Sequence, residues 1–232
     1  MVSIIQVTCL VSGGKDSVFA LWVALHKYKV QSIITIYPEE SDSYLFHIPN
    51  CKHVGLIAHM LSIPHIIVYS SKNNLDHEIK VLKDVLEETK TEAVITGGIR
   101  SDYQRYKFNR AAKLAGMKCL SPLWRLKPET LISELFTNNF NVIFVAVSSM
   151  GLGKDLLGKK MTFENIERIR KITTGTDLSL IGEGGEYESF VLNAPFFPSE
   201  IKILRSRVHW NETREEGFFE ILEAKLVEKI HF

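Results

Sequence analysis

The stretch Val11-Ser12-Gly13-Gly14-Lys15-Asp16-Ser17 decides the fold, because it joins an apolar run to an amphipathic one. The run before it, Ile4–Val11, is rich in β-branched residues, which favour a strand. The segment after it, Ser17–Lys29, repeats apolar residues at intervals of three and four, which is a helical period. Two glycines between them let the backbone turn sharply and bring its N–H groups close to an anion. We therefore expect a strand, an anion-binding loop and a helix, in that order.

The alternation of short apolar runs with longer amphipathic segments continues through the first half of the chain. The further expected strands are Val30–Tyr37, His65–Tyr69 and Ala93–Thr96. The further expected helices are Lys52–Leu61, Asn73–Lys90 and Tyr103–Ala115. Such alternation predicts an α/β fold with a doubly wound parallel sheet, which binds ligands at the carboxyl ends of its strands.

The pattern changes after Pro122-Leu123-Trp124. A helix over Glu129–Phe136, a strand over Val142–Val147 and a helix over Glu164–Ile172 follow, and the part from Glu186 onward is richer in strands. We therefore expect a Rossmann-like nucleotide-binding domain over residues 1–125 and a smaller C-terminal α+β domain over residues 126–232, which would bind the substrate.

The composition excludes several classes of protein. Apolar residues make up 45% of the 232 residues and charged residues 24%, which is typical of a folded globular protein. The formal net charge of +1 gives no global basic field that would hold a nucleic acid. The three cysteines form no CxxC pair, which favours a reducing compartment. With no signal peptide in the first five residues and no apolar run near the ~20 residues of a membrane span, we expect a cytoplasmic protein without a membrane partner.

The side chains of the glycine-rich loop suit a phosphate. Lys15 adds a full positive charge, Ser12 and Ser17 add hydroxyl donors, and the helix that follows points its positive end at the same place. Asp16 is placed to cap this helix or to hold a magnesium ion. The loop is not a Walker A motif, because Cys9 replaces its first glycine and Asp16 follows the lysine. A strand–helix turn without a ligand is the alternative, and the lysine at the helix start disfavours it.

SGGKDS in this setting resembles the PP-loop of the N-type ATP pyrophosphatases, in the adenine nucleotide alpha-hydrolase superfamily. The resemblance implies that ATP is cut to AMP and pyrophosphate while the loop holds the departing pyrophosphate. It also implies that a substrate oxygen is adenylated and that a nucleophile then displaces AMP. The motif is specific for the superfamily but not for the substrate.

Three further segments narrow the choice. They are YLFHIPN (44–50), GGIRSDYQR (97–105) closed by SPLW (121–124), and GEGGEYES (182–189) followed by APFF (194–197). With the PP-loop, they resemble the diphthine–ammonia ligase family from the first strand to about residue 197. The resemblance implies that the diphthine side chain of translation elongation factor two is amidated to diphthamide through an acyl-adenylate. Ammonium would be the nitrogen donor, ATP and Mg²⁺ would be required, and no nucleic acid would bind directly.

The resemblance also implies a set of site residues. The expected catalytic residues are Lys15, Asp16, Arg100 and Glu186. The expected ATP-contacting residues are Ser12, Gly13, Gly14, Lys15, Asp16, Ser17, Ile36, Gly97, Gly98 and Arg100. The expected substrate-contacting residues are Tyr103, Gln104, Glu183, Gly184, Gly185, Glu186, Tyr187 and Glu188. Asp16 is the expected magnesium ligand.

The chemistry of these residues fits that reaction. Glu183, Glu186 and Glu188 provide three carboxylates, and Tyr103 and Tyr187 provide aromatic faces, both suited to the trimethylammonium group of diphthine. A glutamate here would orient or deprotonate ammonium. A solvated hairpin is the alternative for such an acidic glycine-rich turn.

Four residues in or beside the expected site each have an alternative role. Arg100 follows a strand end beside the loop and would pair with the α-phosphate, whereas the role of Arg105 is left open; both could also be ordinary surface cations. His47 and Asn50, in a loop after the second strand, would border the nucleotide or the substrate, although a lone histidine is more often structural.

Some features depart from the family or favour other functions. Lys107 and Asn109 stand where the family usually has arginine and glutamate, and Asn193 stands where it usually has aspartate, which affects the expected substrate contacts. The segment Gly153–Lys160 misses a Walker A motif, because Lys160 replaces its hydroxyl residue. The alternative functions are a PP-loop enzyme that modifies tRNA and an ATP-binding sensor without turnover. The oligomeric state, including a homodimer, is left open.

Overall fold

The computed structural model describes residues 4–38, 50–70, 75–148, 151–176 and 178–229. The chain forms two compact units. The first unit combines residues 1–12, 16–47 and 57–125, and the second combines residues 13–15, 48–56 and 126–232. The segments 13–15 and 48–56 therefore belong to the second unit, although they precede residue 125 in the sequence.

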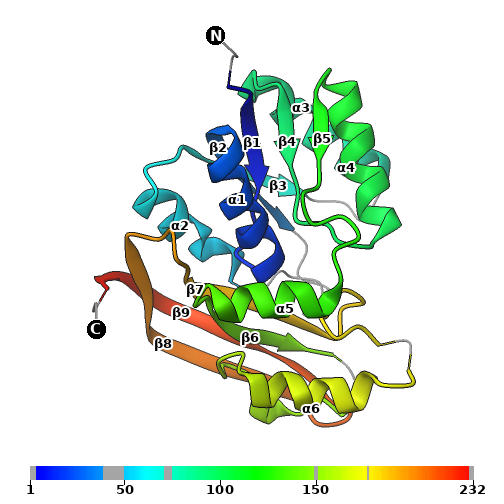
Figure 1. Ribbon diagram of the computed structural model, residues 1–232, viewed down its shortest axis with the longest axis vertical. Coiled ribbons are helices and arrows are strands. Elements are labelled where there is room, and N and C mark those ends of the chain that lie inside the picture. The colour runs from blue at the N-terminus through cyan, green and yellow to red at the C-terminus, as the bar shows by residue number, and fades with distance from the viewer. Residues whose placement is uncertain (1–3, 39–49, 71–74, 149–150, 177, 230–232) are drawn as a thin grey trace. The chain divides into compact units, whose positions relative to one another are not determined.

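The first unit contains a sheet of five strands in the order β3-β2-β1-β4-β5 (Figure 1). The strands are β1 (Gln6–Leu10), β2 (Lys29–Pro38), β3 (His65–Ser70), β4 (Ala93–Ile95) and β5 (Lys118–Leu120). Every neighbouring pair in this sheet is parallel. The prediction of a doubly wound α/β fold is confirmed.

The helices of this part of the chain are α1 (Lys15–Lys27), α2 (Val54–Met60), α3 (Leu75–Thr89) and α4 (Asp102–Leu114). Buried side chains of α3 and α4 pack together with Ile34 of β2 and Val94 of β4, so these two helices cover one face of the sheet (Figure 1). The chain moves from β1 to β2 in one direction and from β4 to β5 in the other. Right-handed crossovers then place the connection that contains α1 on the opposite face.

The direction of winding reverses between β1 and β4, which lie side by side in the sheet. In open α/β sheets, ligands bind at the carboxyl ends of the strands at such a switch point. Two glycine-containing segments follow these two strands, the phosphate loop after β1 and Gly97-Gly98 after β4. The fold therefore places both at the position where a nucleotide is expected.

The second unit contains an antiparallel sheet of four strands in the order β7-β6-β9-β8. Its strands are β6 (Asn141–Val147), β7 (Tyr187–Asn193), β8 (Ser199–Asn211) and β9 (Glu216–Glu228). Its other elements are α5 (Pro128–Thr137), α6 (Phe163–Thr173) and the short 3₁₀ helices η1 (Cys51–His53) and η2 (Lys154–Leu156). The predicted α+β character of the C-terminal part is confirmed. In the described part of the chain, no helix has the length and apolar character of a membrane span.

Candidate active site

The start of the phosphate loop is fixed to strand β2. The Val11 N–H donates to the Ile34 carbonyl at 2.9 Å, and the Val11 carbonyl accepts from the Thr35 hydroxyl at 2.9 Å. His65 Nε2 lies 2.9 Å from the same hydroxyl. Because the hydroxyl proton goes to the Val11 carbonyl, His65 must donate here, and burial lowers the pKa of this histidine. These bonds hold the end of β1 in place.

Within the first unit, Ser12 and Ser17 close the loop on itself. The Ser12 N–H donates to Ser17 Oγ at 3.1 Å, and the two hydroxyl oxygens lie 3.1 Å apart. Gly97 packs directly on the first turn of α1, since a Cβ there would lie 2.7 Å from the Ser17 nitrogen and 2.8 Å from the Asp16 carbonyl carbon. Only glycine permits this contact, which brings the ends of β1 and β4 together as predicted for the switch point.

Two expected nucleotide contacts differ in their surroundings. Ile36 is partly buried and packs against the core beneath α3 and α4. Gly98, in contrast, has room for a side chain, since an added Cβ would approach Thr96 Oγ to only 4.0 Å. Their contacts with ATP stay predictions.

Within the second unit, the middle of the loop runs along strand β7, which is an edge of its sheet. The Gly13 carbonyl accepts from the Val191 N–H at 2.9 Å, and the Lys15 N–H donates to Ser189 Oγ at 3.1 Å. Gly13 has a φ of +85°. The glycine-rich loop and the strand that begins in GEGGEYES are thus hydrogen-bonded to each other.

The side chain of Lys15 is enclosed by this same segment. Its ammonium donates to the Ile181 carbonyl at 2.5 Å and lies 5.2 Å from the centre of the Tyr187 ring. Only 3% of Lys15 is exposed. Tyr187 is itself a core residue, because its hydroxyl donates to the Leu180 carbonyl at 3.0 Å and its ring packs edge-on against Phe144.

The turn before β7 is closed by Glu186. The carboxylate of Glu186 accepts from the backbone N–H of Ser179 at 2.5 Å and of Gly184 at 2.9 Å. Gly182 and Gly185 have positive φ angles of 73° and 89°, which lets the backbone fold around the carboxylate. These contacts favour an anchoring role for Glu186. The catalytic role that the resemblance implies for it stays a prediction.

Glu188 is placed differently from Glu186. It is partly buried on β7, and its carboxylate makes no hydrogen bond within the described part of the chain. Burial raises the pKa of Glu188 to about 7, although the nearby positive charge of Lys15 acts in the opposite direction. Burial also raises the pKa of the Cys51 thiol to about 11, with a smaller contribution from the charge of Glu188. Glu188 is therefore a carboxylate near Lys15 that holds a proton more readily than usual.

The expected contacts on α4 and before it lie at the surface of the first unit. Tyr103 is 57% exposed, and Gln104 and Arg100 are also exposed. The guanidinium of Arg105 stacks 4.3 Å from the centre of the Trp124 ring. Lys107 forms an ion pair with Glu78 at 3.0 Å. The contact of Arg100 with a phosphate and those of Tyr103 and Gln104 with substrate stay predictions.

Asn50 contacts the backbone of β9 in the second unit. Its side-chain amide donates to the Phe219 carbonyl at 2.9 Å and accepts from the Ile221 N–H at 2.6 Å. His53 donates from Nε2 to the Ile221 carbonyl at 2.8 Å. These side chains bind backbone groups of β9 beyond Phe218, the last residue of β9 that is paired with β6. Asn50 therefore has a structural role, while His47 lies outside the described residues.

We expect Asn50→Ala to lower the free energy of unfolding by about 2–4 kcal/mol, because it leaves the buried polar groups of Phe219 and Ile221 without partners. His53→Ala is the matched comparison, since it removes one hydrogen bond to β9, that to the Ile221 carbonyl, and Asn50→Ala removes two. Its loss should be about half as large. Denaturant unfolding of the three proteins measures both values, and equal losses in the two variants would contradict this role.

The segment Gly153–Lys160 is part of the second unit and packs within it. Asp155 forms an ion pair with Arg168 of α6, with N–O distances of 2.5 and 3.3 Å. Gly158 lies against the Phe219 ring, where a Cβ would come within 2.7 Å of Cδ2. The segment is thus a packed connection, and α6 begins only at Phe163, three residues after Lys160, rather than at the lysine as in a Walker A motif.

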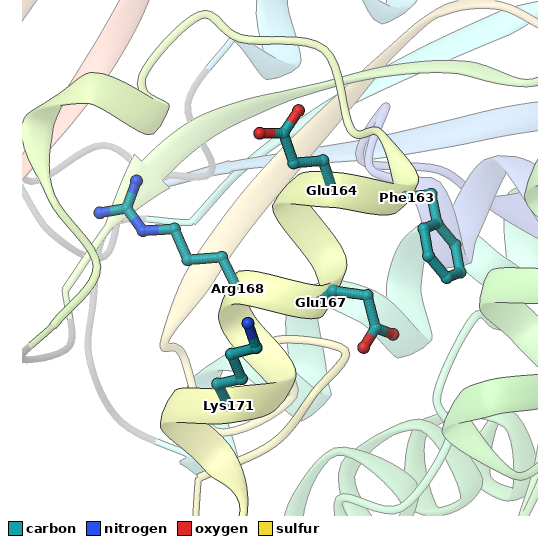
Figure 2. Close-up of a pocket in the computed structure, with 5 residues that line it drawn as sticks. All are labelled: Phe163, Glu164, Glu167, Arg168 and Lys171. Carbon is teal, nitrogen blue, oxygen red and sulfur yellow. The ribbon is translucent and has the colours of Figure 1, made fainter.

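A surface depression of about 480 Å³ lies on helix α6. Figure 2 shows the side chains that line it, and all of them come from this one helix: Phe163, Glu164, Glu167, Arg168 and Lys171. It contains none of the motif residues. Among the described residues, no group of three or more His, Cys, Asp or Glu side chains could hold a metal ion.

Comparison with known proteins places these motifs in a family. The model of the diphthamide synthase N-terminal domain matches residues 5–119, and that of the diphthamide synthase C-terminal domain matches residues 127–227. A solved structure described as a predicted subunit of tRNA methyltransferase from Methanocaldococcus jannaschii aligns over 96% of this chain and 98% of its own, with a TM-score of 0.40 and 18% identity. A TM-score this low supports no conclusion.

Curated relatives carry the name diphthine–ammonia ligase. The protein from Schizosaccharomyces pombe is 30% identical over 93% of this chain, which spans only 39% of that relative. The proteins from Danio rerio and Mus musculus are 29% and 26% identical over 85% of this chain, and the alignments cover 86% and 82% of their lengths. Because the models of both diphthamide synthase domains match in order, the chain belongs to the diphthamide synthase family.

Proposed function

We propose that the chain is an ATP-dependent ligase that converts the carboxylate of diphthine to an amide and forms AMP and pyrophosphate. The observation that carries this proposal is the contact of Lys15, the lysine of the phosphate loop, with Tyr187 and Ser189 of GEGGEYES and with the adjoining Ile181. These contacts bring the lysine that would hold the pyrophosphate to the same place as the glutamate-rich segment that would hold the substrate. The names of the curated relatives support the same substrate.

The proposed reaction has two steps. In the first, a carboxylate oxygen of diphthine attacks the α-phosphorus of ATP, and the bond to the oxygen that bridges the α and β phosphates breaks. The backbone amides after Ser12, the start of α1 and Lys15 would stabilise the pyrophosphate that leaves. Arg100 would neutralise charge on the α-phosphate. In the second step, ammonia attacks the acyl carbon and AMP departs.

Magnesium would bind at the start of α1. Mg²⁺ in nucleotide sites is held by one or two carboxylates together with phosphate oxygens, and Asp16, in the first turn of this helix, supplies one such carboxylate. When bound, Mg²⁺ would neutralise charge on the phosphates, and Asp16 would hold the ion beside the loop.

The protein substrate proposed is translation elongation factor two that carries diphthine, with ammonium as nitrogen donor. The two alternatives predict other products. A PP-loop enzyme that modifies tRNA would release AMP with tRNA, and an ATP-binding sensor would leave ATP intact under every condition. The near-neutral net charge disfavours the first of these.

The experiment is an incubation of the protein with ATP, Mg²⁺, ammonium and diphthine-bearing elongation factor, with a parallel incubation that contains tRNA. We expect AMP release with the factor only, together with the loss of about one mass unit that accompanies replacement of a carboxylic OH by NH₂. Release of ADP, or AMP release with tRNA alone, would contradict the proposal.

A further inference from the structure

The three glutamates of GEGGEYES differ in what their carboxylates contact. Both oxygens of Glu186 are used by backbone N–H groups of the turn, those of Ser179 and Gly184. The carboxylate of Glu188 makes no hydrogen bond among the described residues, and only the backbone of this residue is paired, in the ladder between β6 and β7. A carboxylate that is partly buried without a hydrogen-bond donor lacks the stabilisation that such groups normally have. Glu188 therefore has both oxygens available for a cationic donor.

The position of Glu188 on β7 puts it beside the phosphate loop. Side chains alternate across a strand, so Glu188 and Phe190 point to the same face. Phe190 is the side chain against which Gly13 packs, since a Cβ on Gly13 would lie 2.8 Å from Phe190 Cδ2. Lys15, in the same loop, is close enough for its positive charge to lower the pKa of Glu188. Glu188 thus lies next to the residues that would hold the pyrophosphate.

We propose that Glu188 binds ammonium and accepts its proton, and that Glu186 serves only to hold the turn that positions Glu188. This assignment rests on the proposed function. Ammonium is a compact cation with four N–H donors and no lone pair, so it must lose a proton before it can attack a carbonyl. An unpaired, partly buried carboxylate is suited to both tasks.

The proton balance of the step is simple. Ammonium gives one proton to the Glu188 carboxylate and becomes ammonia, whose lone pair forms the C–N bond as the C–O bond to AMP breaks. The second proton leaves the nitrogen for water as the amide forms, and Glu188 then returns its proton to solvent. A pKa of Glu188 near 7 suits this cycle, because the group can both accept and release a proton at neutral pH. The charged group that acts on Glu188 is Lys15, from the loop, and the charge of Glu188 in turn raises the pKa of Cys51, from η1.

The test separates the two chemical steps in the full chain. Exchange of labelled pyrophosphate into ATP, with diphthine-bearing factor and without ammonium, measures adenylation alone. We expect Glu188→Gln to lower amide formation from ammonium by about 10²-fold more than it lowers this exchange. Hydroxylamine is unprotonated at neutral pH and needs no proton acceptor before it attacks. It should therefore restore turnover of Glu188→Gln, as hydroxamate, to within about tenfold of the unchanged protein.

Glu186→Gln is the matched control. Its amide group would present N–H donors to a backbone N–H, so the turn should open, both steps should slow, and hydroxylamine should not rescue them. The inference is overturned if Glu188→Gln amidates normally, slows pyrophosphate exchange and amide formation equally, or is not rescued by hydroxylamine. If the unchanged protein shows no exchange with diphthine-bearing factor, the proposed function itself fails, which is a different result from a defect confined to the variant.

Discussion

Lys15→Ala is expected to reduce AMP formation by about 10³-fold or more, because it removes the one positively charged side chain of residues 12–17, which the proposed function places beside the departing pyrophosphate. Lys15 belongs to the second unit, where its side chain contacts Ile181 and Tyr187. These contacts hold the side-chain ammonium group of Lys15 at a fixed position and restrict its rotamers. A group that is already oriented costs little reorganisation when charge develops beside it. The rate of AMP release under saturating ATP measures this effect.

Loss of packing must be separated from loss of charge. Lys15 is almost fully buried, so alanine would also leave a cavity and an unsatisfied Ile181 carbonyl. Lys15→Met keeps most of the aliphatic stem and removes the charge, and its stability should exceed that of Lys15→Ala. Both variants should lack activity. If Lys15→Met formed AMP at a near-normal rate, the lysine would be a packing residue and the loop would have another function.

The fold was largely predictable because its signal is local. Each buried strand of the first unit is an apolar run with an amphipathic helix beside it, and the runs at β1, β2, β3 and β4 were all identified from the sequence. Strand β5 was not anticipated. It has only three residues, Lys118–Leu120, of which the first is exposed, so neither length nor periodicity marks it.

The candidate site was predictable as two motifs but not as an arrangement. The loop and GEGGEYES each carry a sequence signature, yet the hydrogen bond from Lys15 to Ser189 joins residues 174 positions apart. The difference between Glu186 and Glu188 depends on the turn geometry that Gly182 and Gly185 adopt, which spacing alone does not reveal. Asn50 was expected to border the nucleotide or the substrate because it lies in a loop after the second strand. Its actual partners are backbone groups of a strand about 170 positions away.

Gly13→Ala is also expected to reduce AMP formation strongly, because Gly13 packs directly against Phe190 of β7. A Cβ at this position would lie 2.8 Å from Phe190 Cδ2, closer still to Cε2, and 3.3 Å from Val54 Cγ2. Phe190 is fully buried, so its ring has little space in which to move. The loop must shift instead, and displacement of a catalytic group by about 1 Å costs about 10²-fold in rate. We expect a loss of that size in AMP formation.

The control for Gly13→Ala is a glycine with the same backbone conformation and no neighbour. Gly116 has a φ of +70°, against +85° for Gly13, and nothing lies within 4 Å of a Cβ placed there. Gly116→Ala should cost only the backbone penalty of about 1–2 kcal/mol in unfolding free energy and leave AMP formation intact. Gly13→Ala should cost more, because overpacking adds about 1–3 kcal/mol.

Phe190→Leu should recover part of the stability lost in Gly13→Ala when the two are combined, since the effects of mutations at contacting residues do not add. Equal stability losses in the two alanine variants, with normal AMP formation in both, would mean that the loop does not depend on its contact with Phe190.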